Sequence, residues 1–419
     1  MGAVNCATST CHGSTIPWYS SNVLQNEYTT WIRLDPHSQA YNTLLNEDSK
    51  RIVKNLGLKE PAHQAKICLD CHAHNPAPNR RGERFILSEG VTCESCHGPS
   101  EKWIASHTVK DVRHADNIRN GLYPTSRPAD QARLCLSCHF GDESRFVTHR
   151  IMGAGHPRMS FEISTFAALE PAHYRVDRDY IDRKGVSNAV QLWAIGQVIA
   201  AQTFLETLAD PKRNRDGIFP EMVLFDCHSC HHSMSDKRWT PRHGLPPGVV
   251  RLNDSSLLMV RSLTLALNAP ASKQFDEVVA RLHAAAIGGK TPANPSVQSQ
   301  PIEQIAIELS KMMNSLIPVL EKTRFDQSVQ RGLLLALIDE TKTPSYADYA
   351  GAEQAYMALV GLSNGLAKNG GLKVTDPMKQ SFERLRGLLG NEDQYRASRF
   401  VQELGTLRTT VVAHSVGSK

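Results

Sequence analysis

The ten cysteines constrain the fold of this 419-residue chain more than any other feature, because all of them lie in five copies of one short pattern. In every copy a histidine directly follows the second cysteine. The copies are Cys6/Cys11/His12, Cys68/Cys71/His72, Cys93/Cys96/His97, Cys135/Cys138/His139 and Cys227/Cys230/His231. Cysteines three residues apart project from the same side of a helical turn, so both thiols can attach one haem while the adjacent histidine binds its iron. The pattern predicts five covalently bound haem c groups.

Two other uses of cysteine fit the pattern less well. Zinc sites also contain C-x-x-C pairs, but they do not require a histidine after every second cysteine. A disulfide framework of ten cysteines would leave the five adjacent histidines unexplained. The first copy has the rarer spacing C-x4-C-H, and excluding it would leave Cys6 and Cys11 without a role. We therefore keep all five copies as haem sites.

Composition limits the class of partner. The formal net charge is +5, and five haems with ionised propionates would add about −5 in the oxidised state by charge counting. The basic balance is therefore interpreted as compensation for haem. The basic residues do not form runs with interleaved aromatic residues, so we expect no nucleic-acid partner.

The motifs also predict a location. Haem is attached to C-x-x-C-H outside the cytoplasmic membrane, so we expect a periplasmic or extracellular protein. No charged and apolar leader precedes Cys6, so the sequence is read as a mature form without its signal peptide. No apolar stretch reaches the ~18 residues of a membrane span. The nearest candidate, residues 190–208, is interrupted by glutamines and a glutamate and predicts an amphipathic helix.

The chain has two unequal halves. Every cysteine and sixteen of the eighteen histidines precede residue 245, in a half rich in Pro, Gly, Asn and Asp. Long helical patterns follow the Pro-Pro-Gly at 246–248. We expect a mainly α fold with little β structure: a loop-rich, haem-packed cytochrome domain over residues 1–248 and a cofactor-free antiparallel helical bundle over residues 249–419.

Apolar residues at positions i, i+3, i+4 and i+7 predict three helices in the second half. The first covers 275–286, and the second covers 302–316 and ends before Pro318. The third begins at Asp376-Pro377 and stops at Gly390. Residues 288–301 are predicted to be a flexible connection.

Each iron needs a second axial ligand or an open site. Eighteen histidines less the five of the motifs leave thirteen, and five of these would complete bis-histidine ligation. The predicted distal ligands are His37, His107, His149, His156 and His173. Glycines between residues 149 and 156 would let the backbone approach a flat ring closely. For the fifth ligand the competitors are His232, His74, His63 and His114, and ligation by Met152 or Met159 is a less favoured alternative.

Two blocks resemble a known family. GVTCESCHG at residues 90–98, followed by Trp103 and His107, and THRIMGAGHPRMSFE at 148–162 resemble multihaem cytochromes of the cytochrome c-554 type, a tetrahaem family that accepts electrons from hydroxylamine oxidoreductase. The resemblance covers roughly residues 1–240. It implies closely packed haem pairs and distal ligands at residues 37, 107, 149 and 156. The motif at Cys227 and the long helical extension depart from it.

Electron transfer between redox protein partners is the favoured function, because five haems in about 240 residues must nearly touch and bis-histidine ligation saturates the iron. The alternative is an enzyme that reduces or oxidises small nitrogen or sulfur compounds at one five-coordinate haem. Arg150, Arg158 and His173 could supply its acid–base groups, but nothing singles them out. A third possibility is a subunit of an extracellular cytochrome filament, a homo-oligomer or a membrane respiratory complex.

Overall fold

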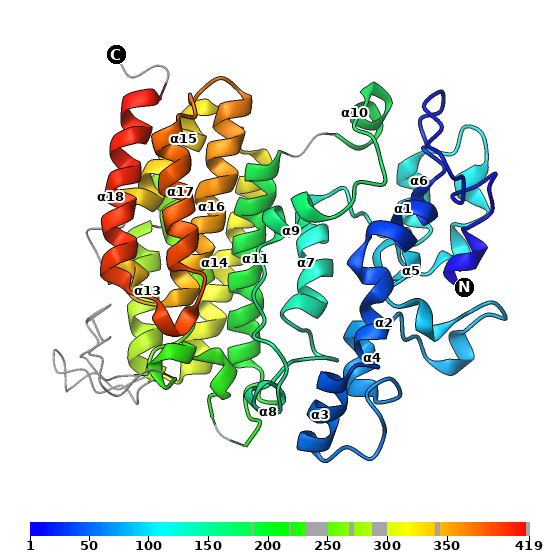
Figure 1. Ribbon diagram of the computed structural model, residues 1–419, viewed down its shortest axis with the longest axis horizontal. Coiled ribbons are helices and arrows are strands. Elements are labelled where there is room, and N and C mark those ends of the chain that lie inside the picture. The colour runs from blue at the N-terminus through cyan, green and yellow to red at the C-terminus, as the bar shows by residue number, and fades with distance from the viewer. Residues whose placement is uncertain are drawn as a thin grey trace. The chain divides into compact units, whose positions relative to one another are not determined.

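The computed structural model describes residues 1–185, 188–217, 219–231, 250–267, 272–286, 300–339 and 344–415. The chain divides into two compact units (Figure 1). The first unit contains Met1–Phe161 and Phe166–Ser187, and the second contains Glu162–Thr165 and Asn188–Lys419. The predicted mainly α fold is confirmed, because extended pairing among the described residues is limited to isolated bridges such as Gly141 with Phe146.

The two units do not follow the predicted domain boundary. Their division in the sequence lies near residue 188, so the motif at Cys227 belongs to the second unit rather than to the first. Compactness and the ability to fold alone are different properties. The domains 1–248 and 249–419 therefore stay a prediction.

The first unit consists of short helices joined by long loops, as expected for a segment rich in Pro, Gly, Asn and Asp. Its helices are α1 (Glu27–Leu34), α2 (Ala40–Thr43), α3 (Glu47–Leu56), α4 (Lys66–His72), α5 (Cys93–His97), α6 (His114–Arg119), α7 (Pro128–His139), α8 (His149–Gly153) and α10 (Arg178–Lys184), and α9 (Ile163–Leu169) contains a boundary between the units. One small apolar cluster gathers around Leu44 and Leu69.

Three of these helices end on a motif histidine. Helix α4 ends at His72, α5 at His97 and α7 at His139. Helix α7 begins with Pro128, whose fixed φ suits the first turn of a helix. The two cysteines of each of these motifs therefore lie in the last turn, and the histidine follows them at the helix end.

The second unit is a bundle of long helices. They are α11 (Ala189–Ala209), α12 (Ser255–Ala266), α13 (Ser272–Ala286), α14 (Ile302–Lys322), α15 (Gln327–Asp339), α16 (Tyr349–Lys368), α17 (Asp376–Leu388) and α18 (Ala397–His414). Helices α17 and α18 pack against each other across a short loop and so run in opposite directions (Figure 1). The predicted helices over 275–286 and from Asp376 are confirmed as α13 and α17.

Two details of the helix predictions are wrong. Helix α14 does not stop before Pro318 but continues to Lys322, because Ile317 and Leu320 are buried and their packing outweighs the lost main-chain hydrogen bond. Helix α11 is not amphipathic, since its residues are buried on nearly all faces. Even Gln197 is buried there, where its amide donates to Gln354 Oε1 at 2.8 Å. Packing at the centre of the bundle explains both differences.

Two predicted features, Pro-Pro-Gly at 246–248 and nearly all of the 288–301 connection, lie outside the described residues. Among the residues the structure describes, every helix is too short or too polar to cross a lipid bilayer.

Candidate metal centres

Four motif histidines each lie beside one of the predicted distal histidines. We call these the four histidine pairs: His12 with His107, His72 with His156, His97 with His173, and His139 with His37. Their ring centroids are 6.2, 6.4, 6.2 and 6.1 Å apart in the same order. Every pair joins one motif to one histidine from elsewhere in the first unit. The partners are four of the five predicted distal ligands.

The centroid spacing matches two imidazoles on opposite faces of one iron. A bond from a metal to an imidazole nitrogen is about 2.0 Å, and a five-membered ring with bonds of about 1.35 Å has a radius of about 1.15 Å. Two trans imidazoles therefore have centroids about 6.3 Å apart. The observed range of 6.1–6.4 Å fits this value, so a bis-histidine iron fits between each pair.

In five of these eight histidines, the ring nitrogen Nδ1 forms a hydrogen bond to an oxygen. The contacts are His12 to Glu27 Oε2 at 2.8 Å, His37 to Asp35 Oδ1 at 2.9 Å, His72 to the Ala40 carbonyl at 3.1 Å, His107 to the Ile104 carbonyl at 2.5 Å and His156 to the Pro157 carbonyl at 2.8 Å. An Nδ1–H that donates to oxygen fixes the tautomer and leaves Nε2 as the metal-binding atom.

Burial favours the neutral form of three motif histidines. It lowers the pKa of His97 to about 4, with a smaller contribution from His173, and it lowers the pKa of His139 to about 4, helped by His37. Burial also lowers the pKa of His72. Neutral imidazole is the form that binds a metal. These three rings are therefore ready to act as ligands at neutral pH.

The two histidines with carboxylate partners behave differently. The hydrogen bond to Glu27 raises the pKa of His12, and the hydrogen bond to Asp35 raises the pKa of His37. The same two carboxylates orient the rings, because each accepts the Nδ1 proton. The predicted ligands thus fall into two groups, one whose pKa is raised by a carboxylate and one whose pKa is lowered by burial.

The thiols bring the motifs together in two sets. All ten cysteines are free, and none is held in a disulfide. Cys6 lies beside Cys93, and this neighbouring thiol lowers the pKa of Cys6 to about 7. Cys138 lies beside Cys71, and this neighbouring thiol lowers the pKa of Cys138 to about 6. The first motif therefore lies beside the third, and the second lies beside the fourth.

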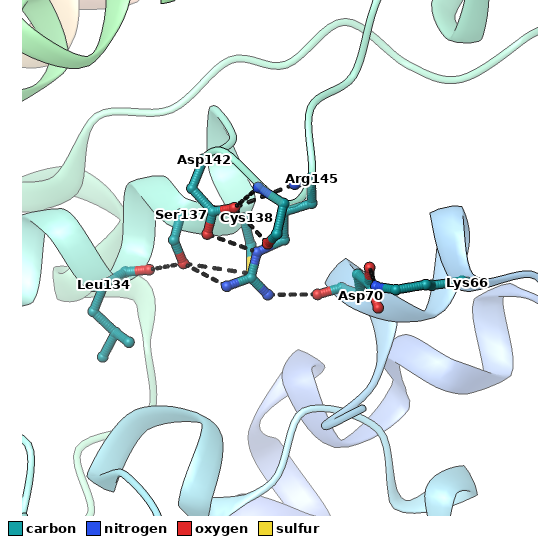
Figure 2. A network of polar contacts seen from close by, with 8 residues as sticks. Lys66, Asp70, Leu134, Ser137, Cys138, Asp142 and Arg145 are labelled. Atoms are coloured by element: carbon teal, nitrogen blue, oxygen red, sulfur yellow. Dashed lines mark hydrogen bonds and ion pairs between the residues drawn. The ribbon is translucent and has the colours of Figure 1, made fainter. Parts of the chain in front are cut away.

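Arg145 connects the second and fourth motifs from outside the thiol contact (Figure 2). Its guanidinium donates to the Asp70 main-chain oxygen at 2.5 Å, to Ser137 Oγ at 3.1 Å and to Asp142 Oδ2 at 3.2 Å. Asp70 stands between the two cysteines of α4, and Ser137 precedes the second cysteine of α7. One side chain thus holds the two motif helices together.

Exposure separates two of the predicted attachment cysteines from the rest. Cys11 and Cys230 are exposed, whereas the other eight cysteines are partly buried. Cys230 directly follows a single helical turn and belongs to the second unit, and its attachment to a haem stays a prediction. Cys11 lies in a turn within the longer C-x4-C spacing of its motif.

The fifth site is therefore less defined than the four histidine pairs. Cys227 begins the short helix η8 (Cys227–Ser229), and the main-chain N–H of Cys230 donates to the Cys227 carbonyl at 3.2 Å. Residues three apart in such a turn lie on the same side, so the two thiols keep the spacing that haem attachment needs. His231 follows this turn, and His149 begins α8. Attachment at Cys230 and the axial roles of both histidines stay predictions.

The competing ligands have other surroundings. His74 Nε2 lies 3.8 Å from Glu94 Oε2, and the ring of His63 packs on Tyr41 with centroids 6.3 Å apart. His114 is held neutral, since burial and then Lys184 lower its pKa to about 4. Its buried Nε2 has no hydrogen-bond partner. His232 lies outside the described residues.

Sequence reasoning missed the residues that support the ligands. Asp35 stands two residues before His37, and Asp-Pro-His is a local signal that could have identified it. Glu27 lies fifteen residues from His12, and only the fold brings them together. Glu170 belongs to the same surroundings, because Asp35, His37 and Glu170 each offer a ligand atom within 4.8 Å of the others. We interpret this cluster as support for His37 rather than as a separate cation site, because His37 Nδ1 is already bonded to Asp35.

One comparison with known proteins gives a match. Residues 5–98, which contain the first three motifs, match the family model of cytochrome c554 and c-prime. Neither the search of curated proteins nor the search of solved structures gives a match. The N-terminal region is thus similar to multihaem c-type cytochromes of the c554 type, and the resemblance is confirmed over residues 5–98, which include the block at 90–98. The block at 148–162 lies outside this match.

Proposed function

We propose that this chain is a pentahaem c-type cytochrome that transfers electrons between redox protein partners. The observation that carries the proposal is the spacing of the four histidine pairs, 6.1–6.4 Å between centroids, which suits an iron bound on both faces. The match of residues 5–98 to a haem-binding electron-transfer family supports the same role.

The residues have separate tasks. The two thiols of each motif anchor a haem, the motif histidine occupies one axial position, and the distal histidine occupies the other. When bound, haem c supplies an iron that takes up and releases one electron. Because both axial positions are filled by protein, no coordination site remains for a small substrate at these four centres. This favours a carrier over a reductase or oxidase.

The thiol contacts support transfer within the chain. Cys6 beside Cys93 and Cys71 beside Cys138 hold the attachment points of two haem pairs next to each other. Arg145 fixes the second of these arrangements through α4 and α7. Close and rigid attachment points favour rapid exchange between neighbouring cofactors, because neither has to move.

The fifth haem is proposed on the motif Cys227/Cys230/His231. An exposed Cys230 would place one edge of this haem near the surface, which suits exchange with a docked partner. Four of the five predicted distal ligands belong to the four histidine pairs, and His149 stays a predicted distal ligand without an assigned haem. The bundle after residue 249 is proposed to bind no cofactor. Donor and acceptor would dock transiently, in the periplasm or outside the cell.

The test is haem counting combined with electron paramagnetic resonance (EPR) of the air-oxidised holoprotein. We expect five haems per chain by pyridine haemochrome assay and only low-spin ferric iron. The ring planes of three histidine pairs cross at 78–87°, and those of His12 and His107 at 16°. Crossed planes leave the two iron dπ orbitals that meet the ligands nearly degenerate, whereas parallel planes split them. Three haems should therefore give strongly anisotropic signals and one a rhombic signal, besides the fifth.

Two results would count against the proposal. A stoichiometric high-spin haem that shifts on adding nitrite or hydroxylamine would make the chain an enzyme. Fewer than five haems would refute the count.

A single substitution tests the ligation directly. His156→Ala should convert one haem to high spin, because it removes the ring opposite His72. His63→Ala is the matched control and should leave the spectrum unchanged, since that ring packs on Tyr41. An unchanged spectrum of the His156 variant would refute this pairing.

A further inference from the structure

Two of the axial histidines differ from the others in the chemistry of their Nδ1 partner. His12 donates to the carboxylate of Glu27 at 2.8 Å, and His37 donates to the carboxylate of Asp35 at 2.9 Å. The Nδ1 partners of His72, His107 and His156 are neutral main-chain carbonyls. A carboxylate carries a full negative charge, so its hydrogen bond is stronger and makes the imidazole a more basic ligand.

Both carboxylates are held in place. Glu27 is the first residue of α1, where its other oxygen, Oε1, accepts the main-chain N–H of Gln25 at 3.1 Å. Asp35 caps the short helix η2 (Pro36–Gln39), and its Oδ1 also accepts the main-chain N–H of His37 at 2.9 Å. Their side chains are 18% and 9% exposed, respectively, so solvent screens these charges only weakly.

The two carboxylates fall in different sets of motifs. His12 belongs to the first motif, whose thiol Cys6 contacts the third motif. His37 is paired with His139 of the fourth motif, whose thiol Cys138 contacts the second motif. In each neighbouring pair of motifs, one motif therefore has an axial histidine that donates to a carboxylate.

The other member of each pair lacks such support. For the second motif, both ligands, His72 and His156, donate to main-chain carbonyls. For the third motif, no carboxylate among the described residues accepts a hydrogen bond from His97 or His173. The asymmetry is thus repeated in both pairs.

Resting on the haem ligation proposed above, we propose that Glu27 and Asp35 are positioning residues that lower the reduction potentials of the first-motif and fourth-motif haems. Negative charge transmitted through the imidazole stabilises ferric over ferrous iron. Each neighbouring pair then contains one haem that is reduced after its neighbour.

The test is a potentiometric titration of the holoprotein followed by EPR, with an electrode supplying one electron to each ferric iron. The variants are Glu27→Gln and Asp35→Asn, which keep the side-chain shape and remove the charge. Each should change the ferric-to-ferrous ratio of one haem at least tenfold at fixed potential, towards the ferrous form. A tenfold change corresponds to about 59 mV for one electron. Glu47→Gln is the control, because Glu47 is exposed and pairs with Lys50.

The outcomes separate this inference from the proposed function. If Glu27→Gln and Asp35→Asn retain five low-spin haems and shift no more than Glu47→Gln, the inference is refuted and the electron carrier stands. If the wild-type chain does not bind low-spin haem, the proposed function itself fails. Should an amide variant lose haem, Glu27→Asp and Asp35→Glu keep the charge but move the carboxylate away from its hydrogen bond to Nδ1. A reduction potential unchanged by this displacement would also refute the inference.

Discussion

Replacing Arg145 tests whether one side chain holds the second and fourth motifs together. In Arg145→Met the apolar stem is kept, but the hydrogen bonds to Asp70, Ser137 and Asp142 are lost. The side chain is 28% exposed, so water can replace only part of what is lost. The bonds to the Asp70 main-chain oxygen and to Ser137 Oγ are charge-assisted and contribute about 1.5 kcal/mol each. The ion pair with Asp142 is partly exposed and contributes little. We therefore expect the variant to lose about 3 kcal/mol of unfolding free energy.

The assay is guanidinium unfolding of the holoprotein, followed through the haem absorption so that the signal reports on the haem-binding part of the chain. The control is Arg150→Met, because Arg150 is exposed and makes one long bond, 3.3 Å, to the Leu56 main-chain oxygen. We expect the control to lose less than about 1 kcal/mol. Equal midpoints and slopes for the two variants would show that Arg145 does not join the motifs.

Three further changes probe the ligand loops and the bundle. Gly90→Ala should lower the unfolding free energy by more than about 2 kcal/mol and perturb the proposed haem on His37. The reason is that φ of Gly90 is +77° and a Cβ would lie 2.7 Å from the His37 main-chain oxygen. An unchanged EPR spectrum and an unchanged unfolding midpoint would contradict this. Asn188→Ala should cost about 1 kcal/mol, because its side chain caps α11; the Asn188→Asp variant is the control and should unfold like the wild type. Burial raises the pKa of Glu403, but the hydrogen bond from Arg384 helps to lower it below its ordinary value. The pair therefore stabilises the fold above pH 4.5, and this stabilisation is lost as the pH falls through the pKa of Glu403 in the folded state. Glu403→Gln should therefore be destabilising at pH 7 and less destabilising at pH 3 in urea unfolding.

The chemistry of the site could be predicted from the sequence to the extent that it is local. The motif spacing predicts the proximal histidines, and the surroundings of residues 37, 107 and 156 predict distal ligands, which the fold places beside motif histidines. The partner of each ring could not be predicted, because it depends on contacts between segments as distant as residues 72 and 156. The exposure of Cys230 could not be predicted either, because its motif has the same spacing as three motifs whose cysteines are partly buried.

The supporting residues show the same limit. Asp35 acts across two residues, so its role can be inferred from the local sequence. Glu27 acts across fifteen, and nothing in a helix-initiating glutamate distinguishes it from a solvent-exposed one. In the bundle, the prediction for α14 failed at Pro318 because local propensity cannot weigh the burial of Ile317 and Leu320. Tertiary packing therefore determines where a helix continues in spite of an unfavourable local helix propensity.

The order of the thiol contacts has a consequence for how this region is assembled. Residue 6 contacts residue 93, and residue 71 contacts residue 138, so the two chain segments overlap between 71 and 93. The second contact begins inside the segment that the first contact closes, so the two do not belong to separate modules. A chain that emerges from its N-terminus must wait for the fourth motif before the second contact can form. Truncation between residues 93 and 138 therefore leaves the first contact complete and the second missing, so the assembly of the pairs depends on the direction in which the chain emerges.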